Sequence, residues 1–315
     1  MDVRAARLEE EAAEDFGGRG IAPLVVPGEL AAAAKAARAA TSVVLLTGYP
    51  CCIAEPPTET DGPPGTLALA RALQSLGKHV AILTDDVNYA PIAAALAASN
   101  AAYPSGTPEI QLRAFPPGDV DADSVSTELG IDHIIAVERP GRSAAGGYCT
   151  MRGREMQGIA HLEQLLFNLD GSRRVGVSST GVGDGGNELG MGKRIQLVRE
   201  HIQLGEIIGS IIPTDHLVVA GVSNWGAYAL ALAILLEPEQ GAASGSPTSP
   251  PRSSVVGALV SAEGEKQVLD ALVQGGARDG ITGRADSTVD GISWEAHARK
   301  LHALLALARA APTTN

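Results

Sequence analysis

Short apolar runs alternate with amphipathic or alanine-rich segments along most of this 315-residue chain. Each run has the length of one strand, and the segments between the runs are long enough for helices. Runs that are apolar throughout are typical of strands buried on both faces. The pattern therefore predicts an α/β fold: a doubly wound, mostly parallel (Rossmann-like) sheet with helices on both faces. The expected strands are residues 42–47, 78–84, 110–115, 133–137, 174–178 and 216–220.

The remaining patterned segments predict the helices and the domain organisation. Residues 1–40 are expected to form an N-terminal helical extension, and residues 41–315 a single α/β domain. A low-complexity stretch rich in Gly, Ser and Pro at residues 239–254 is expected to be an exposed insertion in that domain. The helices expected in the domain are residues 66–76, an alanine-rich stretch after Pro91, and residues 124–129, 157–169, 225–236, 263–274 and 294–308.

Composition and charge exclude several classes of protein. The chain is 45% hydrophobic and 19% charged, which is a globular balance, and it has no apolar run of the ~18 residues that span a bilayer. With 36 acidic and 24 basic residues the net charge is −12, which disfavours nucleic acid as a partner. Residues 1–16 lack the apolar core of a signal peptide, so a cytoplasmic protein without a membrane partner is expected. Its three cysteines, two of them adjacent, predict no disulfide framework.

The loop at residues 181–193, which follows the fifth expected strand, is the most distinctive polar feature. In open parallel sheets, ligands bind beyond the carboxyl ends of the strands. Six glycines between residues 181 and 192 let the backbone approach a ligand closely, and Asp184, Asn187 and Glu188 add hard oxygen atoms. These oxygens suit a divalent cation or a substrate ammonium group. The structural alternative is a tight strand–helix connection capped by Asp184 or Asn187.

Loops after the other expected strands carry further candidate groups. A guanidinium binds a carboxylate through two parallel hydrogen bonds, so arginines at strand ends are candidates to hold an acidic substrate. Each group also has a structural interpretation, in which the acids stabilise a helix N-terminus, the arginines pair with nearby acids, and Asn224 caps a helix. The candidates are Gly48, Glu59 and Asp61 after the first strand, Arg139, Arg142 and Arg152 after the fourth, and Asn224 after the sixth.

Two further features argue against common organic cofactors. The sequence GPPGT at residues 62–66 resembles part of a phosphate-binding loop but lacks the lysine that would hold the phosphates. Lys193 adjoins the glycine-rich loop, yet nothing else supports a pyridoxal-phosphate Schiff base there. The expected cofactor is therefore Mg²⁺ or Mn²⁺, held by Asp184 and Glu188, with no nucleotide or pyridoxal phosphate.

Taken together, the motifs resemble those of the D-glutamate cyclase C-terminal domain family. The resemblance implies an intramolecular lyase that converts D-glutamate, a small acidic amino acid, into 5-oxo-D-proline with loss of water. Longer mammalian members are associated with mitochondria, which makes the mitochondrial matrix the alternative compartment. The segments that carry the resemblance are TETDGPPG (58–65), ERPGR (138–142), YCTMRGRE (148–155), GVGDGGNELGMGK (181–193), GVSNWGAYAL (221–230), DGITG (279–283) and TVDG (288–291).

The implied reaction assigns provisional roles to the candidates. The substrate amine must lose a proton, and the charge of the attacked carboxylate must be offset. Asp184 or Glu188 would accept that proton or hold the cation, and Lys193 is a second candidate base. Arg142, Arg152 or the cation would offset the charge, and the glycine amides of the loop would hold the α-carboxylate. The remaining substrate-binding candidates are Gly48, Glu59, Asp61, Arg139, Gly185, Asn187 and Asn224.

Longer family members also carry an N-terminal domain that resembles a hydro-lyase. Only a short segment precedes the first expected strand, so that domain is expected to be absent here. This departure keeps open a binding module or a different enzyme for a small acidic metabolite or nucleotide, as well as a scaffold without activity. The alanine-rich helices leave room for a homo-oligomer.

Overall fold

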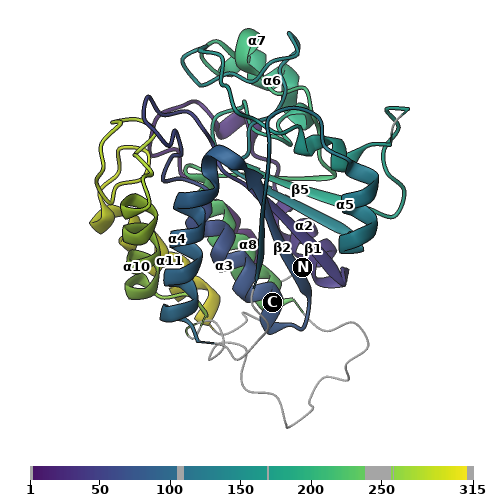
Figure 1. Cartoon of the computed structure of the whole chain (residues 1–315). Helices are drawn as coiled ribbons and strands as arrows, with labels where there is room; N and C mark the ends of the chain where they lie inside the picture. The colour runs from purple at the N-terminus through teal and green to yellow at the C-terminus, as the bar shows by residue number, and fades with distance from the viewer. Residues whose placement is uncertain (1–2, 105–109, 169, 238–256, 258, 311–315) are drawn as a thin grey trace.

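Six parallel strands form one sheet in the computed structural model (Figure 1). The structure describes all residues except 1–2, 105–109, 169, 238–256, 258 and 311–315. The strand order is β3-β2-β1-β4-β5-β6, so the direction of winding reverses between β1 and β4. This confirms the doubly wound α/β fold. The strands are β1 (Ser42–Thr47), β2 (His79–Asp85), β3 (Gln111–Phe115), β4 (His133–Val137), β5 (Ser178–Gly183) and β6 (His216–Val219).

Alternate side chains of the strands enter separate cores on the two faces of the sheet. In β1, Val43 and Leu45 belong to one buried cluster, whereas Val44 and Leu46 belong to another. The larger cluster is covered by α1 (Val3–Ala12), α2 (Glu29–Ala39), α3 (Pro63–Ser75), α4 (Asp86–Ala102), α8 (Ser223–Leu236), α10 (Ala262–Gln274) and α11 (Trp294–Arg309). The opposite face is covered by α5 (Ala122–Leu129) and the 3₁₀ helix η2 (Leu162–Leu166).

The remaining short helices pack around β6. They are the 3₁₀ helix η1 (Ala22–Leu24), the 3₁₀ helix η3 (Gly192–Arg194), α6 (Ile195–His201) and α7 (Gly205–Ile208). Residues of η1, α6 and α7 form a third buried cluster with Leu217 and Val219 of β6. Helix α8 is buried along its whole length, which explains its uniformly apolar sequence.

Three sequence predictions were wrong. The helix expected after Pro91 already begins at Asp86, so that Pro91 lies inside α4. The fifth strand is residues 178–183, not 174–178: Val175 and Gly176 form a turn, and Val175 is 93% exposed. The true strand requires glycine at position 181, because a Cβ there would lie 2.6 Å from the backbone oxygen of Leu189. Close packing of the following loop therefore removes the apolar signal. In place of the helix expected at 157–169, the described residues 157–168 contain the short segment η2 alone, whose Leu162, Leu165 and Leu166 are buried against the sheet.

The N-terminal helices pack directly onto the sheet domain. Helix α1 contacts α8 and α11, and α2 contacts α8 and β6. The Glu9 carboxylate accepts hydrogen bonds from the backbone amides of Gly28 (2.6 Å) and Leu30 (2.7 Å) at the start of α2. These bonds fix the connection between α1 and α2, which runs to the carboxyl edge of the sheet. The predicted insertion at 239–254 lies outside the described residues.

Within the described ranges, none of the helices combines the length and the apolar character that crossing a membrane requires.

Candidate active site

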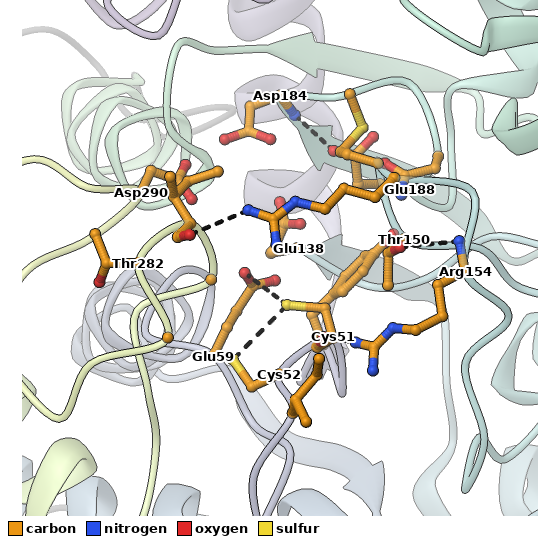
Figure 2. Close-up of a pocket in the computed structure, with 18 of the residues that line it drawn as sticks. Cys51, Cys52, Glu59, Glu138, Thr150, Arg154, Asp184, Glu188, Thr282 and Asp290 are labelled. Atoms are coloured by element: carbon orange, nitrogen blue, oxygen red, sulfur yellow. Dashed lines mark hydrogen bonds between the residues drawn. The ribbon is translucent and has the colours of Figure 1, made fainter.

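A cavity of about 380 Å³ opens at the carboxyl edge of the sheet (Figure 2). Glu138 follows β4 directly and Asp184 follows β5 directly, and in these neighbouring parallel strands Val137, the last residue of β4, pairs with Val182, next to last in β5. Glu188 and Asp290 join them from loops, and Figure 2 shows all four carboxylates directed toward a common space. The cavity thus lies beside the point where the sheet reverses its winding, the usual ligand position in such folds.

The glycine-rich loop wraps around one of its own side chains. The Glu188 carboxylate accepts hydrogen bonds from the backbone amides of Asp184 (3.1 Å), Gly185 (2.6 Å) and Gly186 (2.7 Å). A Cβ at Gly185 would lie 3.0 Å from Glu188 Oε1 and 2.7 Å from the Met151 sulfur, so this turn requires glycine. The expectation that these amides hold a substrate carboxylate is therefore wrong: Glu188 already occupies them.

Two groups of three carboxylates meet at Asp184. Glu138, Asp184 and Glu188 offer oxygen atoms that all lie within 4.8 Å of one another, and so do Asp61, Asp184 and Asp290. Asp184 is only 2% exposed, yet its Oδ2 atom has no hydrogen-bond partner. A buried carboxylate oxygen without a donor is costly, and a cation would satisfy it. The buried acidic clusters could thus hold a metal ion, and the all-oxygen donor set suits a hard divalent cation.

Burial and mutual repulsion disfavour ionisation of these acids when no cation is bound. Burial is the largest cause that raises the pKa of Glu138 and Asp184 well above the usual range, and neighbouring carboxylates raise both further. Burial likewise raises the pKa of Asp61 to about 7, with a further contribution from Asp290. A bound cation reverses this balance, because it favours the charged form of each ligand.

Two of the cavity acids have an unusual backbone conformation. Glu138 has φ +42° and Asp290 has φ +54°, in the left-handed region that residues other than glycine rarely adopt. Such conformations cost on the order of 1–3 kcal/mol and cluster at functional sites. The Glu138 carboxylate is held in place by the Ser223 hydroxyl, which donates to Oε2 at 2.5 Å. The strained backbone conformation of these two residues thus directs their carboxylates into one cavity.

Arg19 also enters the cavity, and sequence reasoning missed it. It lies between α1 and η1, and its 15%-exposed side chain forms ion pairs with Asp184 and with Asp290 (Nη2–Oδ2 3.0 Å). A lone arginine among glycines, far in sequence from any strand end, carries no local signal of this role. Glu138 and Asp290 are likewise absent from the candidates that the sequence offered, although they lie in the ERPGR and TVDG motifs. Their sole available signal was their place in the family motifs.

Several predicted site residues do come together here. Glu59, Arg152, Asp184, Asn187 and Glu188 all line the cavity. The two other predicted residues close to it have structural partners. Asp61 is buried and accepts the amides of Ser223 (2.8 Å) and Asn224 (2.8 Å) at the start of α8, and Gly185 belongs to the turn around Glu188.

Five other predicted residues have partners outside the cavity wall. Arg139 is buried against Asp85 (Nη2–Oδ1 2.7 Å), and Arg142 pairs with Glu163 (Nη2–Oε1 2.6 Å). The Lys193 ammonium donates to Glu29 (2.7 Å) and to a backbone oxygen.

The last two residues, Asn224 and Gly48, determine the local conformation of the backbone. Asn224 Oδ1 accepts the amides of Gly62 (3.1 Å) and Gly65 (2.8 Å) at the start of α3. Gly48 has φ +103°, and a Cβ there would lie 2.6 Å from the Thr84 hydroxyl. The side-chain polar atoms of four of these residues thus face protein partners, and Gly48 is required by its backbone conformation.

Both a family model and a known protein match this chain. Residues 8–305 match the family model described as D-glutamate cyclase-like, C-terminal. A human protein named D-glutamate cyclase, mitochondrial, is 36% identical over 314 residues, which cover 95% of this chain and 51% of the human protein. The chain thus spans about half the length of that relative. This chain belongs to the D-glutamate cyclase-like C-terminal family.

Proposed function

We propose that this protein is a cation-assisted lyase that cyclises D-glutamate to 5-oxo-D-proline with loss of water. The name of the human relative supports the reaction. The observation that carries the proposal for this chain is the buried Asp184, shared by two carboxylate groups, with one oxygen lacking a partner. Such a centre can hold a divalent cation beside a cavity large enough for a small amino acid.

The reaction makes two demands on the site. The substrate ammonium must lose a proton, and the amine nitrogen must then attack the γ-carboxylate carbon, whose negative charge opposes attack. One C–O bond of that carboxylate then breaks, and its oxygen leaves as water with the two protons that the nitrogen gives up. A bound Mg²⁺ or Mn²⁺ would supply Lewis-acid polarisation of that carboxylate. Glu138, Asp184 and Glu188 are the residues that would hold the ion.

The protein's own groups would perform the remaining tasks. Glu59 lines the cavity outside both carboxylate groups. Among the residues that the structure describes, only the Cys51 thiol donates a hydrogen bond to its carboxylate (3.3 Å), so we assign Glu59 the ammonium proton. Arg152 lies at the rim, where its guanidinium donates to the Ile281 oxygen (3.1 Å) and could exchange that bond for the substrate α-carboxylate. Holding one substrate rotamer supplies much of the rate in a ring closure within one molecule.

Removal of the metal should abolish the reaction. Purified protein incubated with D-glutamate and Mn²⁺ or Mg²⁺ is expected to release 5-oxo-D-proline. Chelation by EDTA should lower the rate at least about tenfold, and added metal should restore it. Chiral chromatography measures the product, with L-glutamate as the control substrate. Folded protein that forms no product with any of these ions would refute the proposal.

The strand order, which is that of dinucleotide-binding proteins, favours one alternative. A protein that instead binds a nucleotide would be stabilised against heat by nucleotides and not by D-glutamate or 5-oxoproline. The carboxylate-rich cavity opposes this alternative, because phosphates would be repelled.

Lys193 should be dispensable for the proposed reaction. Its 29%-exposed side chain pairs with Glu29 at the surface, and it is not among the described residues that line the cavity. Lys193→Met is therefore expected to keep the rate of 5-oxoproline formation within about twofold, since a surface ion pair contributes about 1 kcal/mol or less. A rate near zero in folded K193M protein would contradict this prediction and would indicate that Lys193 acts as a base.

A further inference from the structure

The two carboxylate groups that share Asp184 differ in what fills them. In the group of Asp61, Asp184 and Asp290, a cation is already present: the Arg19 guanidinium pairs with Asp184 Oδ1 through Nη1 and lies 3.0 Å from Asp290 Oδ2 through Nη2. In the group of Glu138, Asp184 and Glu188, the hydrogen bonds to the two glutamates come from the Ser223 hydroxyl and from backbone amides. This second group therefore has neutral donors where the first has an arginine.

The two oxygens of Asp184 follow the same division. Oδ1 pairs with Arg19, whereas Oδ2 has no hydrogen-bond partner although the residue is 2% exposed. A bridging carboxylate that serves two cations uses one oxygen for each. Only one of those two cations is supplied by the protein itself.

We infer that Arg19 is the built-in second cation of a two-cation carboxylate centre, so that the centre takes one divalent ion where its carboxylates would otherwise take two. The ion binds to Glu138, Asp184 and Glu188, and the guanidinium holds the place among Asp61, Asp184 and Asp290. This inference rests on the metal binding in the proposed function, but not on the identity of the substrate.

The segment around Arg19 is held in place by contacts other than the ion pairs of the guanidinium. The Asp15 carboxylate accepts the amides of Arg19 (2.9 Å) and Gly20 (2.8 Å), which fixes the turn. The ring of Phe16 also packs edge-on against Trp225, with 6.3 Å between centroids. Replacing only the side chain of Arg19 should therefore leave the segment in place.

A guanidinium in this position has a chemical consequence. Two metal ions in one carboxylate centre typically generate and position a hydroxide for hydrolysis. Arginine supplies a permanent positive charge and hydrogen-bond donors without activating a water molecule. One ion plus one arginine thus suits a reaction that expels water.

The number of bound Mn²⁺ ions per chain tests the inference. Isothermal titration calorimetry with Mn²⁺ alone, checked by elemental analysis of dialysed protein, should give one ion for the wild type and two for Arg19→Gln. Electron paramagnetic resonance should show magnetic coupling between the two ions only in R19Q. Asp290→Asn should bind one ion, and R19Q/D290N should return to one because the second position has lost a ligand.

Controls separate this inference from a general effect of charge or folding. Arg7→Gln removes an exposed arginine from α1 and should keep one ion. Circular dichroism and thermal melting check the fold, and Arg19→Ala replaces R19Q if the latter does not fold. One ion in folded R19Q or R19A, or two or none in the wild type, would overturn the inference. The wild-type count alone decides if neither variant folds.

The product assay tests the proposed function and not this inference. One ion in the wild type and two in R19Q, without any turnover of D-glutamate, would refute the proposed function and leave this inference standing.

Discussion

Asp184→Asn is expected to weaken both cation binding and product formation strongly. Asp184 is the carboxylate common to both acidic groups, and its Oδ2 is the buried oxygen without a partner. An asparagine keeps the shape but loses the charge and one ligand oxygen. Because even residues that only orient metal ligands contribute 10–100-fold, we expect the loss of this ligand to lower Mn²⁺ affinity and the rate by at least about 100-fold. Calorimetry with Mn²⁺ and chromatography of 5-oxoproline measure the two effects.

Asp215→Asn is the matched control for this change. Asp215 precedes β6 at the opposite end of the sheet, where it pairs with Arg173 (2.8 Å) and accepts the Ser179 hydroxyl (2.8 Å). D215N should bind Mn²⁺ and form product as the wild type does. If D184N behaved like D215N, the centre built on Asp184 would have to be abandoned.

Arg139→Ala is expected to lower the free energy of unfolding by about 3–5 kcal/mol, because it leaves a buried charge without its partner. The Arg139 and Asp85 side chains are 1% and 0% exposed. Asp85 also accepts the Ala160 amide (2.7 Å) and the Asn88 side chain (2.9 Å), so it cannot follow its lost partner to solvent. Urea unfolding monitored by circular dichroism measures the change.

Two comparisons make this prediction specific. Arg142→Ala removes an arginine that is 31% exposed, and should cost about 1 kcal/mol or less. Replacing both Arg139 and Asp85 should cost less than the sum of the single changes, since neither charge is then left alone. An R139A protein of unchanged stability but with a raised KM for D-glutamate would instead show that Arg139 binds substrate.

Most of the strands that the sequence located correctly have an uninterrupted apolar core, and β3, with Arg113 at its centre, is the exception. The runs in β1, β2 and β4 lie between two helical layers. Because both faces of these strands are buried, consecutive residues are apolar, and this can be recognised in the local sequence. Strand β5 breaks this rule. Its small residues are required where the loop after it packs back onto Gly181, and a contact between separate segments leaves no local periodicity.

The site residues likewise divide into those that the sequence made recognisable and those that it did not. The loop with Asp184, Asn187 and Glu188 was recognisable because glycines and acids concentrate within a few residues. Arg139 and Arg142 were predicted to bind substrate, whereas in the structure each pairs with an acid from another segment, Asp85 or Glu163. A strand-end arginine looks the same in sequence whether its partner is a ligand or a buried aspartate.

The sequence by itself determined the parallel sheet, the edge at which ligands bind and the acidic loop, because the alternation of strand and helix and the spacing of glycines are properties of neighbouring residues. Only the tertiary structure decided which charges meet. It brings Arg19 and Asp290, from near the two ends of the chain, to Asp184 in the middle. It also buries Arg139 in the core, where the guanidinium pairs with Asp85. The reason is physical: ion pairing depends on distance through space, which the order of strands and the packing of loops set, and on burial, which no single segment controls.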